Sequence, residues 1–203
     1  MNTSARTTAR LLSSALRALL VLSVVTGVVY PLAVTGIAQA AFHDKANGSV
    51  IEHDGRAVGS KLIGQSWNLK GTDAPDPRWF QPRPSHSTYD PLTTGSSQLG
   101  ASDPTLVKTV RETRKQVAAF NGVPPSAVPK DAVTGSASAL DPHISPAYAE
   151  IQIARVAKAR GLTESRVADL VNDHEEGRDL GFLGNARVNV LELNLALSRL
   201  PAN

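Results

Sequence analysis

The chain has 203 residues, no cysteine and a formal net charge of +3. All of the excess charge lies before residue 18, because residues 43–203 contain eighteen basic and eighteen acidic side chains. The basic character of the whole chain therefore gives no support for nucleic-acid binding, and a disulfide-stabilised fold is excluded.

The first predicted element is an uncharged apolar segment, residues 18–42. Three arginines precede it: Arg6, Arg10 and Arg17. Roughly 20 apolar residues in a helix cross a hydrocarbon core of about 30 Å, and basic flanks stay in the cytoplasm. The sequence thus predicts a cytoplasmic tail over 1–17, a transmembrane helix over 18–42 and an extracytoplasmic domain over 43–203. The protein is expected to cross the cell (inner) membrane once.

A secretory signal peptide cleaved before Ala41 is the alternative reading, because the small residues Ala38 and Ala40 fit a cleavage site. The apolar run is longer than a typical signal core of about 7 to 15 residues, so a retained anchor is favoured. In the alternative, the mature protein is a free-standing exported enzyme or binding module.

One face of the apolar helix is predicted to contact partner helices. Ser23, Gly27, Tyr30 and Val34 follow helical spacing, and Gly27 permits close approach of another backbone. Pro31 lacks an N–H, which frees the carbonyl of Gly27 and is expected to bend the helix there.

After the anchor, Asp54-Gly55 lies between two β-rich runs and predicts a hairpin. Trp67 and the pair Trp79-Phe80 are expected in strands or in the core. Residues 75–100 are rich in Pro, Ser, Thr and Gly and predict a long loop.

Four helices are predicted in the C-terminal half, with a short strand as an option at residues 132–134. The alternating leucines of residues 191–197 also leave a strand open for the last segment. An early hairpin followed by helices predicts one α+β domain. The expected starts and ends of the helices are Asp103-Pro104 to Asn121-Gly122, Ser145-Pro146 to Gly161, Thr163 onward, and Asn189 to about Leu200.

Local enzyme signatures are missing from the sequence: there is no Gly-x-Ser-x-Gly elbow, no Gly-x-Gly-x-x-Gly fingerprint and no Walker loop. The five histidines are dispersed, so no metal site is predicted. Arg83, between two prolines, is a candidate for partner contact, with an internal ion pair as the alternative. His143 is expected to be an ordinary hydrogen-bonding residue.

Five segments resemble the C subunit of the bacterial Kdp potassium-transporting ATPase, in the same order and over nearly the whole chain. The chain departs from the family pattern at His86, Gln98 and Ala101, which affects local contacts only. The matching segments are Trp79-Phe-Gln-Pro-Arg-Pro-Ser85, Gly95-Ser-Ser-Gln-Leu-Gly100, Leu140-Asp-Pro-His-Ile-Ser-Pro146, Arg155-Val-Ala-Lys-Ala-Arg-Gly-Leu162 and Arg187-Val-Asn-Val-Leu-Glu-Leu-Asn-Leu-Ala-Leu197.

The resemblance implies a non-catalytic accessory subunit of high-affinity, ATP-driven potassium uptake. The implied partners are a channel-like potassium-binding subunit, a P-type ATPase subunit that hydrolyses ATP, and a small membrane peptide. The family is described as a catalytic chaperone that raises the pump's affinity for ATP. The glutamine implied to contact the nucleotide matches Gln152.

The predicted topology favours an indirect form of this effect, because it places Gln152 across the membrane from cellular ATP. Binding one pump conformation more tightly by about 1.4 kcal/mol shifts its equilibrium tenfold and changes ATP affinity by linkage.

The retained anchor predicts the mass of the mature protein. Mass spectrometry of the membrane-extracted chain is expected to show that residues 18–42 are present. A mature N-terminus at Ala41 would establish the signal peptide instead.

Overall fold

The computed structural model describes residues 2–201, with side chains from residue 4 onward. Met1, Ala202 and Asn203, the outermost residues of the predicted tail and outer domain, lie outside the described residues. The chain divides into two compact units, residues 1–49 and 50–203.

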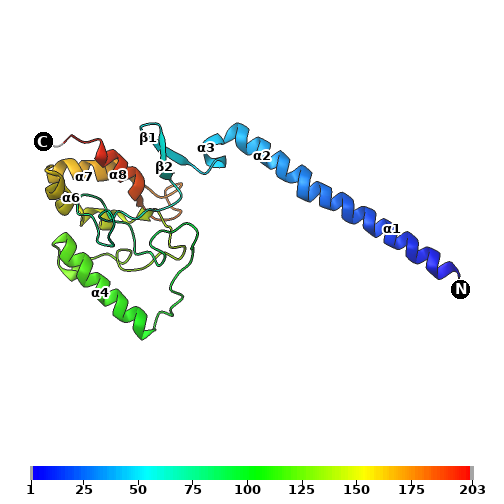
Figure 1. The fold of residues 1–203 in the computed structure, drawn as a ribbon, viewed down its shortest axis with the longest axis horizontal. Helices are drawn as coiled ribbons and strands as arrows, with labels where there is room; N and C mark the ends of the chain where they lie inside the picture. The colour runs from blue at the N-terminus through cyan, green and yellow to red at the C-terminus, as the bar shows by residue number, and fades with distance from the viewer. Residues whose placement is uncertain (1, 202–203) are drawn as a thin grey trace. The chain divides into compact units, whose positions relative to one another are not determined.

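The N-terminal unit is a long helix, shown in blue in Figure 1. It consists of α1 (Asn2–Val24), a π-helical turn η1 (Val25–Val29) and α2 (Tyr30–Ala41). A short helix, α3 (His43–Ala46), follows. The stretch Ser4–Ala41 is long and apolar enough to cross a membrane, so the predicted N-terminal apolar helix is confirmed.

The C-terminal unit begins with the predicted hairpin. β1 (Val50–His53) pairs antiparallel with β2 (Arg56–Ser60), and His53 lies opposite Arg56. The two turn residues, Asp54 and Gly55, have φ angles of 51° and 72°. Positive φ at both central positions is what a two-residue hairpin turn requires, and Asp-Gly supplies it at low cost.

The stretch from residue 61 to residue 103 contains no helix or paired strand, and it includes the long loop predicted over residues 75–100. Phe80 is fully buried, while Trp67 and Trp79 are partly buried and their ring centroids lie 5.2 Å apart. The prediction that these aromatic residues belong to the core is confirmed, whereas the alternative that they lie in strands is wrong. Their rings pack a loop against the core.

The first long helix of this unit is α4 (Pro104–Asn121), and it has the predicted ends. Asp103 caps its first turn by accepting the Thr105 N–H at 2.7 Å. Gly122 ends it with φ of +68°, a conformation that glycine adopts without strain. A 3-10 turn, η2 (Pro125–Ala127), follows.

The second predicted helix is divided in the structure. It forms α5 (Pro146–Glu150) and α6 (Ile153–Arg160), with the break at residues 151–152. Next comes α7 (Glu164–Asp173), capped by Thr163 as predicted.

A three-stranded antiparallel sheet in the order β3-β5-β4 accompanies these helices. Its strands are β3 (His143–Ile144), β4 (Glu175–Glu176) and β5 (Arg187–Asn189). Asn189 ends β5 and caps α8 (Val190–Ser198), so the alternating leucines lie in a helix. Residues 132–134 form turns, and the optional strand there is wrong.

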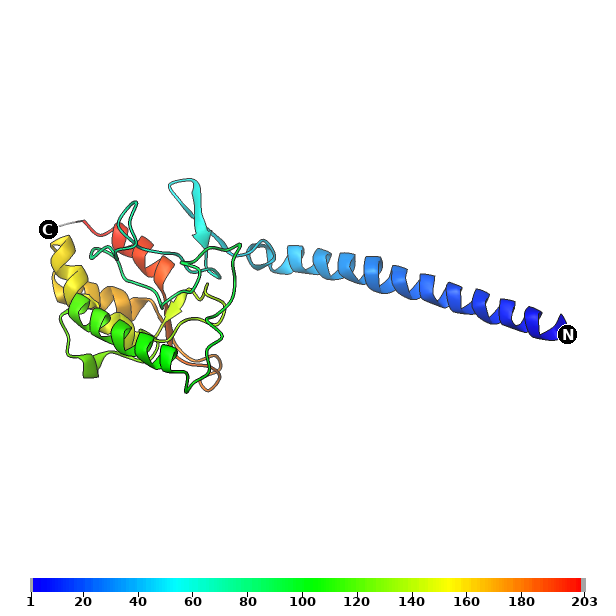
Figure 2. The same ribbon diagram turned by 60° about the horizontal axis from the view of Figure 1, so that its bottom comes forward.

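The core lies among α4 to α8 and the short sheet, in the arrangement visible in Figure 2. α6 packs against both α4 and α7, and α7 packs against α8. The mixed helix-and-sheet fold predicted from the sequence is confirmed. The most buried large side chains of the core are Phe80, Ile144, Val156, Val167, Val188, Leu193 and Leu197.

Candidate functional site

Gln152, the residue that the family resemblance implies in ATP contact, has no exposed surface. Its Oε1 accepts the Gln81 backbone N–H at 2.6 Å and an Arg155 Nη2–H at 2.7 Å. Its Nε2 donates to the carbonyls of Gln81 and Tyr148 at 3.1 and 3.2 Å. An amide has two donors and one oxygen with two lone pairs, so all of its hydrogen-bonding capacity is used inside the protein.

Gln81 continues this network on the loop side. Its Nε2 donates to the carbonyls of Trp67 and Asp76 at 2.9 and 3.0 Å. The Gln81 side chain therefore closes the loop over residues 67–81. The Gln81 backbone N–H and carbonyl pair with the Gln152 amide, as two backbone segments do in a β-bridge. Two hydrogen bonds with Gln152 thus fix Gln81 to the start of α6.

Arg155 lies one turn along α6, against the end of α4. Its Nε donates to Asn121 Oδ1 at 2.9 Å, and its Nη1 donates to the carbonyls of Pro77 and Trp79 at 2.6 and 3.0 Å. The guanidinium carbon lies 4.4 Å from the centre of the Phe120 ring, a cation–π contact.

None of the ion pairs among the described residues includes Arg155. Its charge is instead balanced by carbonyl oxygens, by the nearby Asp76 carboxylate and by the negative C-terminal end of the α4 dipole. Burial lowers the pKa of Arg155 to about 10, so the guanidinium is still protonated at neutral pH.

Asn194 on α8 forms the same kind of side-chain-to-backbone pairing with Phe80, one residue earlier in the loop. Its Oδ1 accepts the Phe80 N–H at 2.9 Å, and its Nδ2 donates to the Phe80 carbonyl at 3.0 Å. Two consecutive loop residues are thus each paired with a buried side-chain amide: Phe80 with Asn194, and Gln81 with Gln152. Arg155 and Asn194 carry no local signal that would predict them as site residues, because their partners Trp79 and Phe80 lie 76 and 114 positions away.

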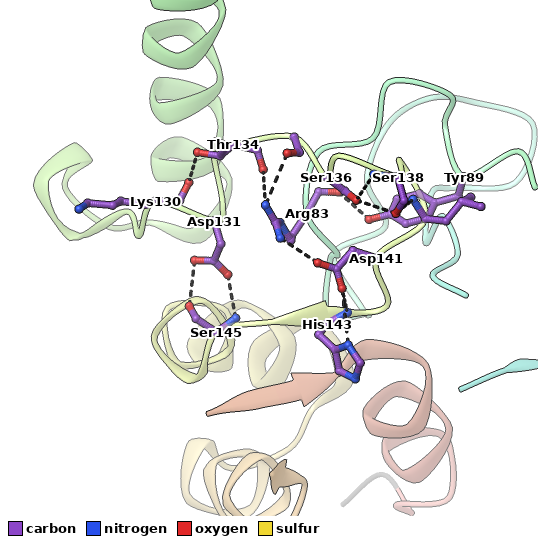
Figure 3. Close-up of polar contacts among 12 residues, drawn as sticks. Arg83, Tyr89, Lys130, Asp131, Thr134, Ser136, Ser138, Asp141, His143 and Ser145 are labelled. Atoms are coloured by element: carbon purple, nitrogen blue, oxygen red, sulfur yellow. Dashed lines mark hydrogen bonds and ion pairs between the residues drawn. The ribbon is translucent and has the colours of Figure 1, made fainter. Parts of the chain in front are cut away.

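Arg83 belongs to a second polar cluster, shown in Figure 3. Its Nη1 lies 2.8 Å from Asp141 Oδ2, and its Nη2 donates to the Thr134 carbonyl at 3.3 Å. His143 Nδ1 lies 3.5 Å from the other oxygen of Asp141. The internal ion pair weighed for Arg83 is therefore present, while a role in partner contact stays a prediction.

The Asp141 carboxylate is held ionised by this cluster. Its half-buried position favours the neutral acid, but hydrogen bonds from His143 and the charge of Arg83 outweigh burial and lower its pKa below the ordinary range. The contribution of Asp141 to stability is consequently present at neutral pH and is lost only as the pH falls through this lowered pKa.

Asp131 completes the cluster at the start of α5 (Figure 3). Its carboxylate accepts the Ser145 N–H at 2.7 Å and the Ser145 Oγ–H at 2.9 Å. Arg187 joins these residues around a hollow of about 330 Å³. Within residues 2–201 no group of three or more His, Asp or Glu side chains is placed to hold a metal ion.

Of the four partner-contact candidates on the long helix, Ser23 precedes the π-turn, Gly27 lies within it, and Tyr30 and Val34 follow it. Tyr30 donates its N–H to the carbonyl of Val25, five residues back, directly before Pro31. A π-turn holds about one residue more than an α-turn, so later side chains are rotated by up to about 100°. Tyr30 and Val34 are therefore turned away from the line that Ser23 and Gly27 follow, and partner contact at these four positions stays a prediction.

Comparison with known proteins gives a consistent result over the chain. A family model described as "K+-transporting ATPase, c chain" matches residues 12–199. The potassium-transporting ATPase KdpC subunit of Streptomyces coelicolor is 50% identical, over all of this chain and 98% of that protein. The subunit of Streptomyces avermitilis is 49% identical over 100% and 99% of the two chains, and that of Mycobacterium tuberculosis 46% over 94% and 99%.

The buried amide predicts a large loss of stability for Gln152→Leu. Leucine removes the partners of the Gln81 N–H and carbonyl and of one Arg155 N–H, at about 1–3 kcal/mol for each buried group left unpaired. The measurement is the thermal midpoint of the full chain in detergent, followed by circular dichroism. Gln116→Leu, on the exposed side of α4, is the control and is expected to cost less than about 0.5 kcal/mol. Equal midpoints for the two variants would contradict the role given to Gln152.

Proposed function

The chain belongs to the family of the K+-transporting ATPase c chain, and from this premise we propose that it is a non-catalytic assembly and regulatory subunit of an ATP-driven potassium importer. The observation that carries the proposal is similarity over the full length of curated KdpC subunits. In the proposed complex, the partners are a channel-like potassium-binding subunit, a P-type ATPase subunit that hydrolyses ATP, and a small membrane peptide.

The proposed topology has residues 1–17 in the cytoplasm, residues 18–42 across the membrane and residues 43–203 outside. The uncharged segment in the long helix and the three arginines before it support this orientation.

The subunit is proposed to act as a catalytic chaperone that raises the ATP affinity of the pump without binding ATP itself. The complete burial of Gln152 supports an indirect effect, since its amide is already bonded to Gln81, Tyr148 and Arg155. A subunit that binds one pump conformation more tightly changes the affinity for a ligand at a distant site. A preference of about 1.4 kcal/mol is sufficient for a tenfold change.

The folded unit suits this task because its central loop is rigid. A surface that selects one conformation of a partner must not adapt to the other conformation. The backbones of Phe80 and Gln81 are held by the amides of Asn194 and Gln152, and Arg83 is held by Asp141. These contacts support a preformed binding surface.

Membrane contact through Gly27 generates one prediction. Gly27 has no neighbouring atom within 4 Å of an added Cβ, so Gly27→Leu leaves the chain's own fold intact and blocks only an approaching helix. Recovery of the large subunits with the tagged chain is expected to fall. Ala33→Leu, which adds a similar bulk on α2 away from the π-turn, is the matched control. Undiminished recovery with Gly27→Leu would assign the contact to another surface.

The proposed function predicts two measurable effects when the gene for this chain is deleted. Cells are expected to lose potassium uptake at micromolar external potassium, and the remaining pump is expected to show a raised KM for ATP. A photoreactive ATP analogue is expected to label the ATPase subunit and not this chain. Normal uptake after deletion would overturn the proposal, and labelling at Gln152 would replace the indirect effect by direct nucleotide contact.

A further inference from the structure

The backbone carbonyl of Thr26 lies in the π-turn η1 and has no N–H partner in the long helix. The N–H four residues later, that of Tyr30, donates to Val25 instead. The residue five positions later is Pro31, which has no N–H. The N–H of Val29 belongs to the π-turn, in which each N–H bonds the carbonyl five residues back. Within the described part of this helix, no backbone donor is therefore placed to pair with the Thr26 carbonyl.

The side chains near this carbonyl supply no donor either. A hydroxyl group in a helix bonds a carbonyl three or four residues before it, so the relevant side chains are those one turn after Thr26. Val29 has no polar side-chain atom, and Tyr30 carries its hydroxyl at the far end of an exposed ring. The Thr26 hydroxyl itself donates to the Leu22 carbonyl at 2.7 Å. The carbonyl and the side chain of Thr26 thus present acceptors only.

The proposed topology places this acceptor in the lipid. At 1.5 Å per residue, Thr26 lies about 12 Å along the helix from Ala18, inside a hydrocarbon core of about 30 Å. Lipid tails offer no hydrogen-bond donor, so a backbone carbonyl left unpaired there is costly. Membrane helices that contain proline are tolerated because a neighbouring helix, a hydroxyl side chain or a water molecule pairs with the freed backbone groups.

We propose that the Thr26 carbonyl accepts a hydrogen bond from a hydroxyl or carboxamide side chain on a membrane helix of a partner subunit. The inference rests on the proposed function, which supplies the partner helices. A neutral donor fits this depth because a charged one is more costly in the hydrocarbon core. The carbonyl belongs to the peptide group shared with Gly27, which has no side chain and has open space around it. A second helix can therefore approach within hydrogen-bond reach.

A donor on a partner helix suits this carbonyl better than a water molecule does. Water reaches membrane depth where polar groups line a cavity, whereas Thr26 is flanked by valines at positions 24, 25, 28 and 29. A partner helix brings its own donor and packs its apolar side chains against these valines.

The chain offers a matched control, because the dipeptide Thr-Gly recurs at residues 35–36. Thr35 lies in α2, where the regular α-helical pattern pairs its carbonyl with the N–H of Gln39. Replacement of Gly27 or Gly36 by glycolic acid converts the preceding amide carbonyl into an ester carbonyl, which is a weaker acceptor, and removes one N–H in each case. The two variants therefore differ in the partner of the weakened carbonyl.

The full chain with Gly27→glycolic acid is expected to recover roughly threefold to tenfold less of the large subunits in detergent than the chain with Gly36→glycolic acid, as the strength of hydrogen bonds between membrane helices implies. Unchanged circular dichroism for both variants shows that folding is intact. Equal recovery would overturn the inference while leaving the proposed function in place. Failure of the wild-type chain to recover any large subunit would overturn the proposed function itself.

Pro31→Ala gives a second measurement. Alanine supplies an N–H that can reach the Thr26 carbonyl, or it lets the helix return to α-turns in which Tyr30 bonds that carbonyl. Either way the carbonyl gains a donor within the chain, and recovery of the large subunits is expected to fall. Leu32→Ala, which keeps the proline, is the control and is expected to recover more than Pro31→Ala. Wild-type recovery with Pro31→Ala would also contradict the inference.

Discussion

The pairing of the Gln81 backbone with the Gln152 side chain is the contact on which the folded unit depends. The stretch over residues 61–103, which has no helix or paired strand, must satisfy its backbone groups where it enters the core, because unpaired buried N–H and C=O groups are costly. Gln152 and Asn194 do this for two consecutive residues, and thereby position Phe80 in the core. The helices pack around a loop that their own amides hold in place.

The same arrangement explains a partly buried guanidinium that forms no direct ion pair. Arg155 neutralises the end of α4, bonds the carbonyls of Pro77 and Trp79, and donates to Gln152. Removing a carboxylate from an ion pair would leave an uncompensated charge, whereas here the compensation is spread over several neutral dipoles. This makes the junction of α4, α6 and the central loop stiff, which suits a subunit proposed to favour one state of a partner.

The long N-terminal helix and the β4–β5 loop show how local backbone irregularities change which side chains share an exposed face. The π-turn before Pro31 changes which side chains share a face of the long helix. Leu180 at positive φ changes which side chains project from the β4–β5 loop. In both places the irregular residues are exposed, so the irregularity leaves core packing unchanged. It alters only which side chains are available for contact with a neighbouring molecule.

The sequence by itself determined the elements whose signals are local: the apolar helix, the Asp54-Gly55 hairpin, the caps of α4 at Asp103 and Gly122, and the family. Turns and helix caps depend on side chains within about two to five consecutive residues, so they can be predicted from the order of residues alone. Only the tertiary structure decided the division of the second helix at Gln152 and the use of that amide. Its partner Gln81 lies 71 positions away, and no local sequence pattern indicates a hydrogen bond between residues so far apart.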